Sequence, residues 1–213
     1  MPLIKKEKYK NIMQLNEKLK KFHIILGSGS PRRKEIFSIL GFDFEIKTFP
    51  TEENYPEDLD KKQVSEFIAV EKAAAFKEML ENQKNSIVIT ADTTVVLENE
   101  ILGKPNGRNG AIEMLKKLSG KKHTVCTGVC IKNHSKEVTF SAYSDVWFRE
   151  LSDEEITFYV DNFKPFDKAG SYAVQEWIGA AAIARIEGSY YNVVGLPSQK
   201  LYMELEKFID GLK

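Results

Sequence analysis

Hydrophobic and polar positions along the chain alternate in ways that predict strands and helices in turn. Residues 22–26 and 86–97 are apolar runs of strand length, and residues 62–80 carry apolar side chains at helical spacing. Residues 123–131 and 137–148 flank a short polar turn and predict a hairpin. The order of these elements predicts an α/β fold in which parallel and hairpin strands mix in one sheet.

Helix boundary signals place further elements. Ser30 suits an N-cap, Pro31 the first helical position and Gly41 the stop, while Ser152 with Glu155 three residues later forms a capping box. With the apolar spacing, these signals predict helices at residues 31–40, 111–120, 151–162 and 198–209. The segments between them include a predicted strand at residues 42–49 and an exposed acidic loop at residues 51–61.

The beginning of the chain reads as an amphipathic helix. Between residues 5 and 22, one apolar face among lysines and glutamates is formed by Ile12, Leu15, Leu19 and Phe22. We therefore predict an N-terminal helical extension over residues 1–22 and a single domain over residues 23–213. A chain of this length fits one larger domain or two small lobes that share a cleft.

Composition and charge narrow the function classes. Hydrophobic residues make up 42% of the 213 residues, enough for a core, and 31 basic residues balance 31 acidic ones. A net charge of zero disfavours a nucleic-acid partner. No run approaches the roughly 18 to 20 apolar residues that a membrane span needs, and the lysine-rich start lacks the apolar run of a signal peptide. We expect a cytoplasmic protein without a membrane or nucleic-acid partner.

The two cysteines, Cys126 and Cys130, lie four residues apart in one predicted strand. At about 3.3 Å per residue their thiols are about 13 Å apart, too far for a disulfide. We interpret them as small buried residues, with a reactive or metal-binding thiol as the lesser alternative. The three histidines show no zinc-binding spacing with them.

The turn from Gly27 to Arg33 is a candidate anion site. It joins a strand to a helix through glycine and serine, so backbone N–H groups and the helix dipole favour a negative ligand, and Arg32 and Arg33 add phosphate donors. It matches neither the P-loop nor the dinucleotide fingerprint. The alternative, a capped helix with two solvated arginines, is equally compatible with this segment alone.

Carboxylates supply the second candidate feature. Asp92 interrupts an otherwise apolar strand, where a carboxylate needs a cation, a hydrogen-bond network or a catalytic purpose. If the strand ends near Ala91, Asp92 lies at its carboxyl end, where α/β folds place their sites. Glu52 and Glu53, in the acidic loop, offer a second carboxylate for a hard divalent cation, although a solvated surface is the simpler interpretation.

Lysines from three separate segments complete the candidates. Lys72, Lys104 and Lys168 lie beside alanine, glycine or proline and suggest a phosphate cage, although single turn lysines are usually surface residues. Gln175 follows an apolar stretch, and its amide can hydrogen-bond a base edge or serve an ordinary structural bond. No serine nucleophile elbow and no HExxH helix is present, so the chemistry points to activated water.

The order of the motifs carries more information than any one of them. The strings are LGSGSPRRKEIFSILGFDFE, EKAAAF, ADTTVVLENEILGKP, LSGKKHTVCTGVCI and PFDKAGSYAVQEWIGAAAIARIEGSYYNVVGLP. In this order, from Ile24 to Phe208, they resemble the Maf family of nucleoside triphosphate pyrophosphatases.

The resemblance implies an elongated mixed β-sheet with flanking helices and a cleft between two lobes, similar to the inosine triphosphate pyrophosphatase fold, and often a homodimer. It also implies hydrolysis of a non-standard or pyrimidine nucleoside triphosphate to the monophosphate and pyrophosphate, with Mg²⁺ or Mn²⁺. The DKAGSYAVQ segment is similar to the branch that acts on dTTP and UTP.

The motifs carry residue roles onto this chain. The resemblance implies that Asp92, Glu53 and Lys104 are catalytic, and that Asp92 and Glu53 hold the metal. Thr93, Gln175 and one arginine of the pair match positions of base selection. The predicted substrate-binding residues are Ser28, Arg32, Arg33, Lys72, Thr93, Lys168 and Gln175.

The chain departs from the family pattern after Gln175. Glu176 stands where glycine is frequent, and a carboxylate there is expected to repel phosphate or to alter the base pocket. Two other functions stay as alternatives: a nucleotide-binding regulator of septum formation without turnover, and a nucleic-acid module that uses Arg32, Arg33 and the lysine-rich first helix.

Overall fold

The computed structural model describes residues 15–212, which form a mixed sheet flanked by helices. The sheet has seven strands in the order β2-β1-β3-β5-β6-β7, with β4 paired to β3. The predicted α/β class with a mixed sheet is thus confirmed. Most of the predicted extension over residues 1–22 lies outside the described residues. Of the remainder, residues 15–19 are helical, and Leu15 and Leu19 are buried.

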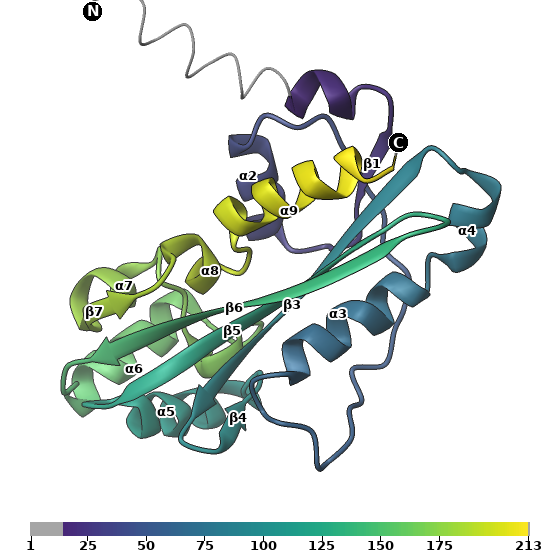
Figure 1. Ribbon diagram of the computed structural model, residues 1–213. Helices are drawn as coiled ribbons and strands as arrows, with labels where there is room; N and C mark the ends of the chain where they lie inside the picture. The colour runs from purple at the N-terminus through teal and green to yellow at the C-terminus, as the bar shows by residue number, and fades with distance from the viewer. Residues whose placement is uncertain (1–14, 213) are drawn as a thin grey trace, which may run out of the picture.

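Three long antiparallel strands run the length of the molecule: β3 (Ser86–Leu97), β5 (Lys122–Lys132) and β6 (Glu137–Phe148) (Figure 1). The predicted hairpin of β5 and β6 is confirmed, because the two strands pair without interruption from Lys122 with Trp147 to Lys132 with Glu137. These long strands connect the part of the sheet that contains β1 and β2 with the part that contains β4 and β7.

Four short strands extend this frame. β1 (His23–Leu26) pairs in parallel with β3 and with β2 (Glu45–Ile46). β4 (Glu100–Leu102) is antiparallel to β3, and β7 (Ile183–Glu187) is antiparallel to β6. The predicted strand at residues 42–49 is therefore reduced to the two residues of β2 that reach β1.

Helices cover both faces of the sheet (Figure 1). The capping box of Ser152 and Glu155 is formed as predicted. In chain order the helices are α2 (Pro31–Ile39), α3 (Val64–Ala74), α4 (Lys77–Asn82), α5 (Gly107–Leu118), α6 (Asp153–Phe163), the short 3₁₀ helix η1 (Ala169–Ser171), α7 (Trp177–Ala182), α8 (Tyr190–Val194) and α9 (Ser198–Asp210).

Two predicted helices have different bounds. The helix expected over residues 62–80 is divided into α3 and α4, because the backbone leaves helical geometry at Phe76 and its ring packs with Ile25 and Val88. The helix expected from residue 111 begins at Gly107, directly after Asn106 as the N-cap. Both differences come from tertiary burial and turn geometry rather than from helix propensity.

The two largest of the four hydrophobic clusters among residues 15–212 lie one after the other along one face of the sheet. The α9 cluster is built on the β1 end of β3 and includes Leu26, Phe37, Ala91, Val129, Leu201 and Phe208. The α6 cluster is built on the β4 end of the sheet and includes Val95, Leu115, Val125, Ile156 and Tyr159. The polar pair of Thr93 and Thr127 lies between them on the same face. The sheet thus supports two lobes with a polar boundary.

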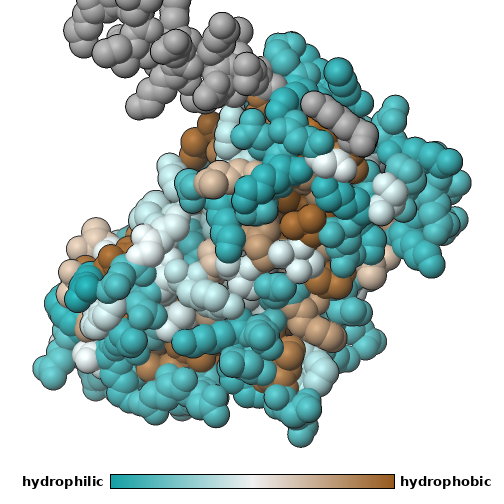
Figure 2. Space-filling model, in the orientation of Figure 1, coloured by the Kyte–Doolittle hydropathy of each residue, from teal (hydrophilic) through white to brown (hydrophobic). Residues whose placement is uncertain are grey.

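On the face seen in Figure 2, hydrophilic residues cover most of the surface and hydrophobic residues form separate patches between them. Within the described part of the chain, no helix combines the length and the apolar character that crossing a bilayer requires. Cys126 and Cys130 are free and buried, and burial raises the pKa of both thiols to about 12. Neither thiol is therefore ionised near neutral pH.

One glycine sets the distance between α3 and the sheet. A Cβ added to Gly128 of β5 would lie 2.2 Å from the Cα of Glu66 in α3. Because Gly128 also pairs directly with Asp92 of β3, this close approach brings α3 over the middle of the long strands. The position of α3 on this face depends on the missing side chain.

We predict that Gly128→Ala lowers the free energy of unfolding by about 1–3 kcal/mol, because the methyl group overpacks the contact with α3. Urea unfolding followed by circular dichroism measures the change. Gly110→Ala in α5 is the matched control, since its Cβ meets only ordinary contacts of 3.7 Å or more. A Gly128→Ala protein as stable as the wild type would contradict the close packing of α3.

Candidate active site

A cleft of about 760 Å³ opens between the two lobes, and all ten predicted site residues line it. They come from the turn before α2, the first turn of α2, the acidic loop, α3, β3, the turn after β4, and the segments on both sides of η1. These residues are Ser28, Arg32, Arg33, Glu53, Lys72, Asp92, Thr93, Lys104, Lys168 and Gln175. The structure thus brings the whole set together, while the role of each one stays a prediction.

The cleft lies where one edge of β3 has no neighbour. On this edge β3 pairs with β1 up to Ile89 and with β4 from Val95, and no described strand pairs with the residues between. The strand predicted over residues 86–97 is confirmed as β3, and β5 pairs with its other edge. Because β3 continues through Asp92 to Leu97, the condition that would put Asp92 at the carboxyl end of the strand is not met. Successive side chains point to opposite faces of a strand, so an open edge lets both faces contribute to one cleft.

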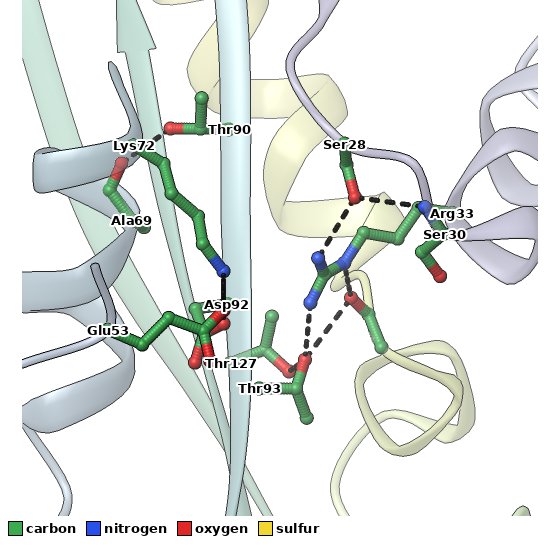
Figure 3. Close-up of polar contacts among 11 residues, drawn as sticks. Ser28, Ser30, Arg33, Glu53, Ala69, Lys72, Thr90, Asp92, Thr93 and Thr127 are labelled. Atoms are coloured by element: carbon green, nitrogen blue, oxygen red, sulfur yellow. Dashed lines mark hydrogen bonds and ion pairs between the residues drawn. The ribbon is translucent and has the colours of Figure 1, made fainter. Parts of the chain in front are cut away.

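Two carboxylates share one ammonium group at this edge. The Nζ of Lys72 lies 2.7 Å from a carboxylate oxygen of Asp92 and 2.7 Å from one of Glu53. The side chains of Asp92 and Lys72 are 14% and 18% exposed, whereas Glu53 is half exposed. Figure 3 shows Lys72 reaching from α3 toward both acids. The buried acid therefore has the cation that its position in the strand requires.

The two acids differ in their affinity for protons. Burial raises the pKa of the Asp92 carboxyl above its usual value, although Lys72 and Arg33 act in the opposite direction. For Glu53 the hydrogen bond from Lys72 is the largest cause, and it lowers the pKa. Asp92 is thus the better proton acceptor of the two, and Glu53 stays ionised to lower pH.

Arg33 lies on the opposite side of the cleft and is held by three neighbours. Its guanidinium donates to Ser28 Oγ at 3.1 Å, to Thr93 Oγ1 at 3.0 Å and to the carbonyl of Gly195 at 2.9 Å (Figure 3). Burial lowers the pKa of Arg33, yet a guanidinium keeps its charge near neutral pH. The contacts leave two of its five N–H donors for a ligand.

Arg32 and Lys168 meet at a carboxylate that the sequence reasoning did not select. Asp167 lies 2.8 Å from the Nζ of Lys168 and 3.8 Å from Arg32, and it lines the cleft. The side chain of Lys168 is only 10% exposed and also lies 3.4 Å from Glu176. Asp167 directly precedes Lys168 in the DKAGS string, but only Lys168 was predicted to be a site residue.

Lys104 and Gln175 are exposed parts of the cleft wall. Lys104 follows β4 in the turn before α5, and its charge contributes to the lowered pKa of Glu53. Across residues 15–212 it makes no hydrogen bond or ion pair. Gln175 lies in the loop before α7 with its side chain open to solvent. Both side chains are therefore available to a ligand.

Glu176, which was expected to repel phosphate or to alter the base pocket, has a partner outside the cleft lining. This residue is not part of the cleft lining, although Gln175 before it is. Its carboxylate accepts a hydrogen bond from the hydroxyl of Tyr159 and faces the ammonium of Lys168. A carboxylate with two such partners is directed behind the wall, so the expected repulsion of phosphate does not follow from its position.

The two carboxylates fit a hard divalent cation that takes its remaining ligands from water and from the phosphates of a substrate. Asp92 and Glu53 approach a common point from two elements, and Lys72 occupies that point as a positive group. Among the described residues, no group of three or more His, Cys, Asp or Glu side chains is placed to hold a metal. Mg²⁺ commonly binds one or two carboxylates and takes its other ligands from water and substrate phosphates.

Two further cleft features were missed by the sequence reasoning. Tyr172 lines the cleft and bonds through its hydroxyl to His123 at 2.7 Å, and burial lowers the pKa of His123 to about 4. Gly195 supplies the carbonyl that holds Arg33, from a backbone φ of +126°. The sequence alone does not single out Tyr172 or Gly195, because each acts through a contact with a residue that is distant along the chain.

The cationic side chains and paired carboxylates in one cleft are typical of enzymes that act on phosphorylated substrates. The model of the Maf family, described as Maf-like protein, matches residues 23–208. The chain belongs to this family, as the order of its motifs predicted.

Two dTTP/UTP pyrophosphatases of similar length support the assignment. The dTTP/UTP pyrophosphatase of Bacteroides thetaiotaomicron is 52% identical over 190 residues, which cover 89% of this chain and 97% of that protein. The dTTP/UTP pyrophosphatase of Flavobacterium johnsoniae is 45% identical over 195 residues, 92% of this chain and 100% of that protein. The solved Ham1 protein of Staphylococcus aureus aligns with a TM-score of 0.49 and 16% identity, over 90% of this chain and 100% of that one.

We predict that Lys72→Met raises the pKa of both Asp92 and Glu53, because each carboxylate loses the ammonium that favours its charged form. Carbon-13 NMR of the labelled carboxyl groups, followed against pH, measures both values. Lys77→Met, on the exposed side of α4, is the control and leaves them unchanged. If Lys72→Met left both titrations in place, the shared ion pair would be wrong.

Proposed function

We propose that this protein hydrolyses dTTP and UTP to the monophosphate and pyrophosphate by attack of water at the α-phosphorus. The observation that carries the proposal is the pair of carboxylates, Asp92 and Glu53, joined by Lys72 across the cleft from Arg33. The names of the relatives, at 45–52% identity over about 90% of the chain, support the choice of substrates.

The cations of the cleft would bind the triphosphate. Arg33 offers two free N–H donors from a fixed position, and Arg32, Lys104 and Lys168 line the same space. Backbone N–H groups at the start of α2, after Ser30, add donors for an anion. Positive charge placed before the reaction stabilises the charge that builds on the leaving pyrophosphate.

The reaction itself needs one water molecule and one proton acceptor. The water oxygen forms a bond to the α-phosphorus, the bond from this phosphorus to the bridging oxygen breaks, and that oxygen leaves with pyrophosphate. The raised pKa of Asp92 suits it to take the proton from water. The ammonium of Lys72 then stabilises whichever carboxylate stays charged. Asp92 is thus the proposed base, and Glu53 is the second, ionised carboxylate beside it.

A divalent cation, Mg²⁺ or Mn²⁺, is part of the proposal, held by Asp92 and Glu53. When bound, it would neutralise phosphate charge and lower the pKa of a bound water. The side chain of Lys72 would move aside or share the carboxylate oxygens. Lys104 lines the same cleft and its charge acts on Glu53, and we assign it the role of adding positive charge toward the leaving group.

Base selection is assigned to Thr93 and Gln175 together with Arg32. Gln175 is exposed at the cleft wall, and its amide can both donate to and accept from the edge of a pyrimidine. Thr93 is less free, because its hydroxyl already accepts from Arg33. We place the activity in the cytoplasm, where nucleoside triphosphates are made and used. A homodimer stays a prediction, which light scattering of the purified chain measures.

We predict that the protein converts dTTP and UTP to monophosphates, and that Asp92→Asn lowers kcat/KM by about 10²–10⁴-fold, the usual contribution of a general base. Reaction in ¹⁸O-water, with both products analysed by mass spectrometry, locates the attack: the label enters the monophosphate and not pyrophosphate. Asp43→Asn, an exposed residue outside the cleft, serves as the control.

Other outcomes of this experiment separate the alternatives. Label in pyrophosphate would mean attack at another phosphorus, and full activity in Asp92→Asn would remove the proposed base. A triphosphate that binds tightly and stays intact for hours would favour the nucleotide-binding regulator.

We predict that a chelator stops turnover and that Mg²⁺ or Mn²⁺ restores it. Glu53→Gln should need a higher metal concentration for half-maximal rate, because it removes one of two negatively charged ligands. Glu52→Gln, its exposed neighbour outside the cleft lining, is the matched control. Turnover that survives chelation would count against the metal-dependent mechanism.

A further inference from the structure

The side chain of Glu176 ties the cleft wall to helix α6 behind it. It is the N-cap residue of α7, directly after Gln175, and its side chain is 23% exposed. Its carboxylate accepts from the hydroxyl of Tyr159 in α6 and lies 3.4 Å from the ammonium of Lys168. One carboxylate thus links a cleft lysine, the loop that carries Gln175, and the buried Tyr159 of α6.

Tyr159 makes this link rigid. The residue is fully buried, and its ring stacks on Phe163 with the centroids 5.1 Å apart. The same hydroxyl that donates to Glu176 accepts the backbone N–H of Ala173 at 3.3 Å. Ala173 lines the cleft, so the hydroxyl fixes the loop at two points, three residues apart.

The loop also lies close against the start of α7. A Cβ added to Gly179 of α7 would lie 1.8 Å from the carbonyl oxygen of Val174. The first turn of α7 therefore rests directly on the loop before Gln175. Lys168, at the other end of the same loop, has only two anionic partners among the described residues: Asp167, which is 69% exposed, and the more buried Glu176.

We propose that Glu176 is a positioning residue that braces Lys168 and the loop of residues 168–176, so that Lys168 and Gln175 meet the substrate in fixed positions. The carboxylate acts from behind the wall and does not touch the substrate. The effect on substrate affinity rests on the proposed function, whereas the effect on Lys168 does not.

Two substitutions separate a brace from a repelling charge. Glu176→Gln removes the charge but keeps an oxygen that accepts from Tyr159, while Glu176→Gly removes every contact. A brace predicts that KM for dTTP rises about tenfold in Glu176→Gly and stays within about threefold in Glu176→Gln, with kcat changed less than about twofold in both. A carboxylate that repels phosphate predicts a lower KM in both variants, and this result would overturn the proposal. Glu113→Gln, exposed on α5, is the matched control.

A second measurement needs no turnover. Acetylation of lysine amines, read by peptide mass spectrometry, compares Lys168 with exposed Lys164 in the same protein. In the wild type Lys168 should react more slowly than Lys164, and Glu176→Gly should accelerate Lys168 about tenfold, because protection follows the local opening of its contacts. Should Glu176→Gly fold poorly, Tyr159→Phe removes the other tie and should accelerate Lys168 several-fold.

The two measurements fail in different ways. If the wild type turns over neither dTTP nor UTP, the proposed function is wrong, and the acetylation rates still decide whether Glu176 braces Lys168. If Lys168 reacts equally in the wild type, Glu176→Gly and Tyr159→Phe, the brace is wrong whatever the kinetics show. An unchanged KM in a folded Glu176→Gly protein also overturns the proposal.

Discussion

The cleft depends on a strand that changes partners along one edge. β3 pairs with β1 as far as Ile89 and with β4 from Val95. On its other edge β3 pairs with β5 from Val88 to Val96, without a break. The interval between the two partners exposes backbone and both faces of the strand to one space. Adjacent residues that would otherwise be separated by the sheet, Asp92 and Thr93, can then line the same cleft. A β3 paired along its full length would close this site.

The cost of burying the Asp92 carboxylate is offset by the charge of Lys72, and close packing of α3 on the sheet brings that charge near. Asp92 has a raised pKa because of desolvation, and Lys72 supplies the nearest opposing charge from α3. The helix can bring that charge so near because Gly128, opposite Asp92 in the sheet, leaves room for its backbone. In this protein the buried carboxylate of Asp92 and the glycine at position 128 therefore belong together, because a larger residue at 128 would push α3 and Lys72 away from Asp92.

Sequence predicts those features that local patterns encode. The apolar run around Asp92, the Ser30–Pro31 helix start and the hairpin were all recognisable, and the order of motifs indicated which residues share a site. The break at Phe76, the approach of α3 to Gly128 and the contacts of Glu176 were not. Each of these depends on a partner far away in sequence, and no propensity or spacing specifies which residue that partner is.

The cations of the cleft differ in how far the fold has already fixed them. Arg33 is held by three hydrogen bonds, and Lys72 and Lys168 each lie between two carboxylates. Arg32 has a single distant acid at 3.8 Å, and Lys104 is open to solvent. Ordering a free lysine or arginine side chain costs up to about 2 kcal/mol, a cost that the fixed cations have met during folding. A triphosphate would therefore gain its electrostatic stabilisation chiefly from the fixed groups, while Arg32 and Lys104 adapt to its conformation.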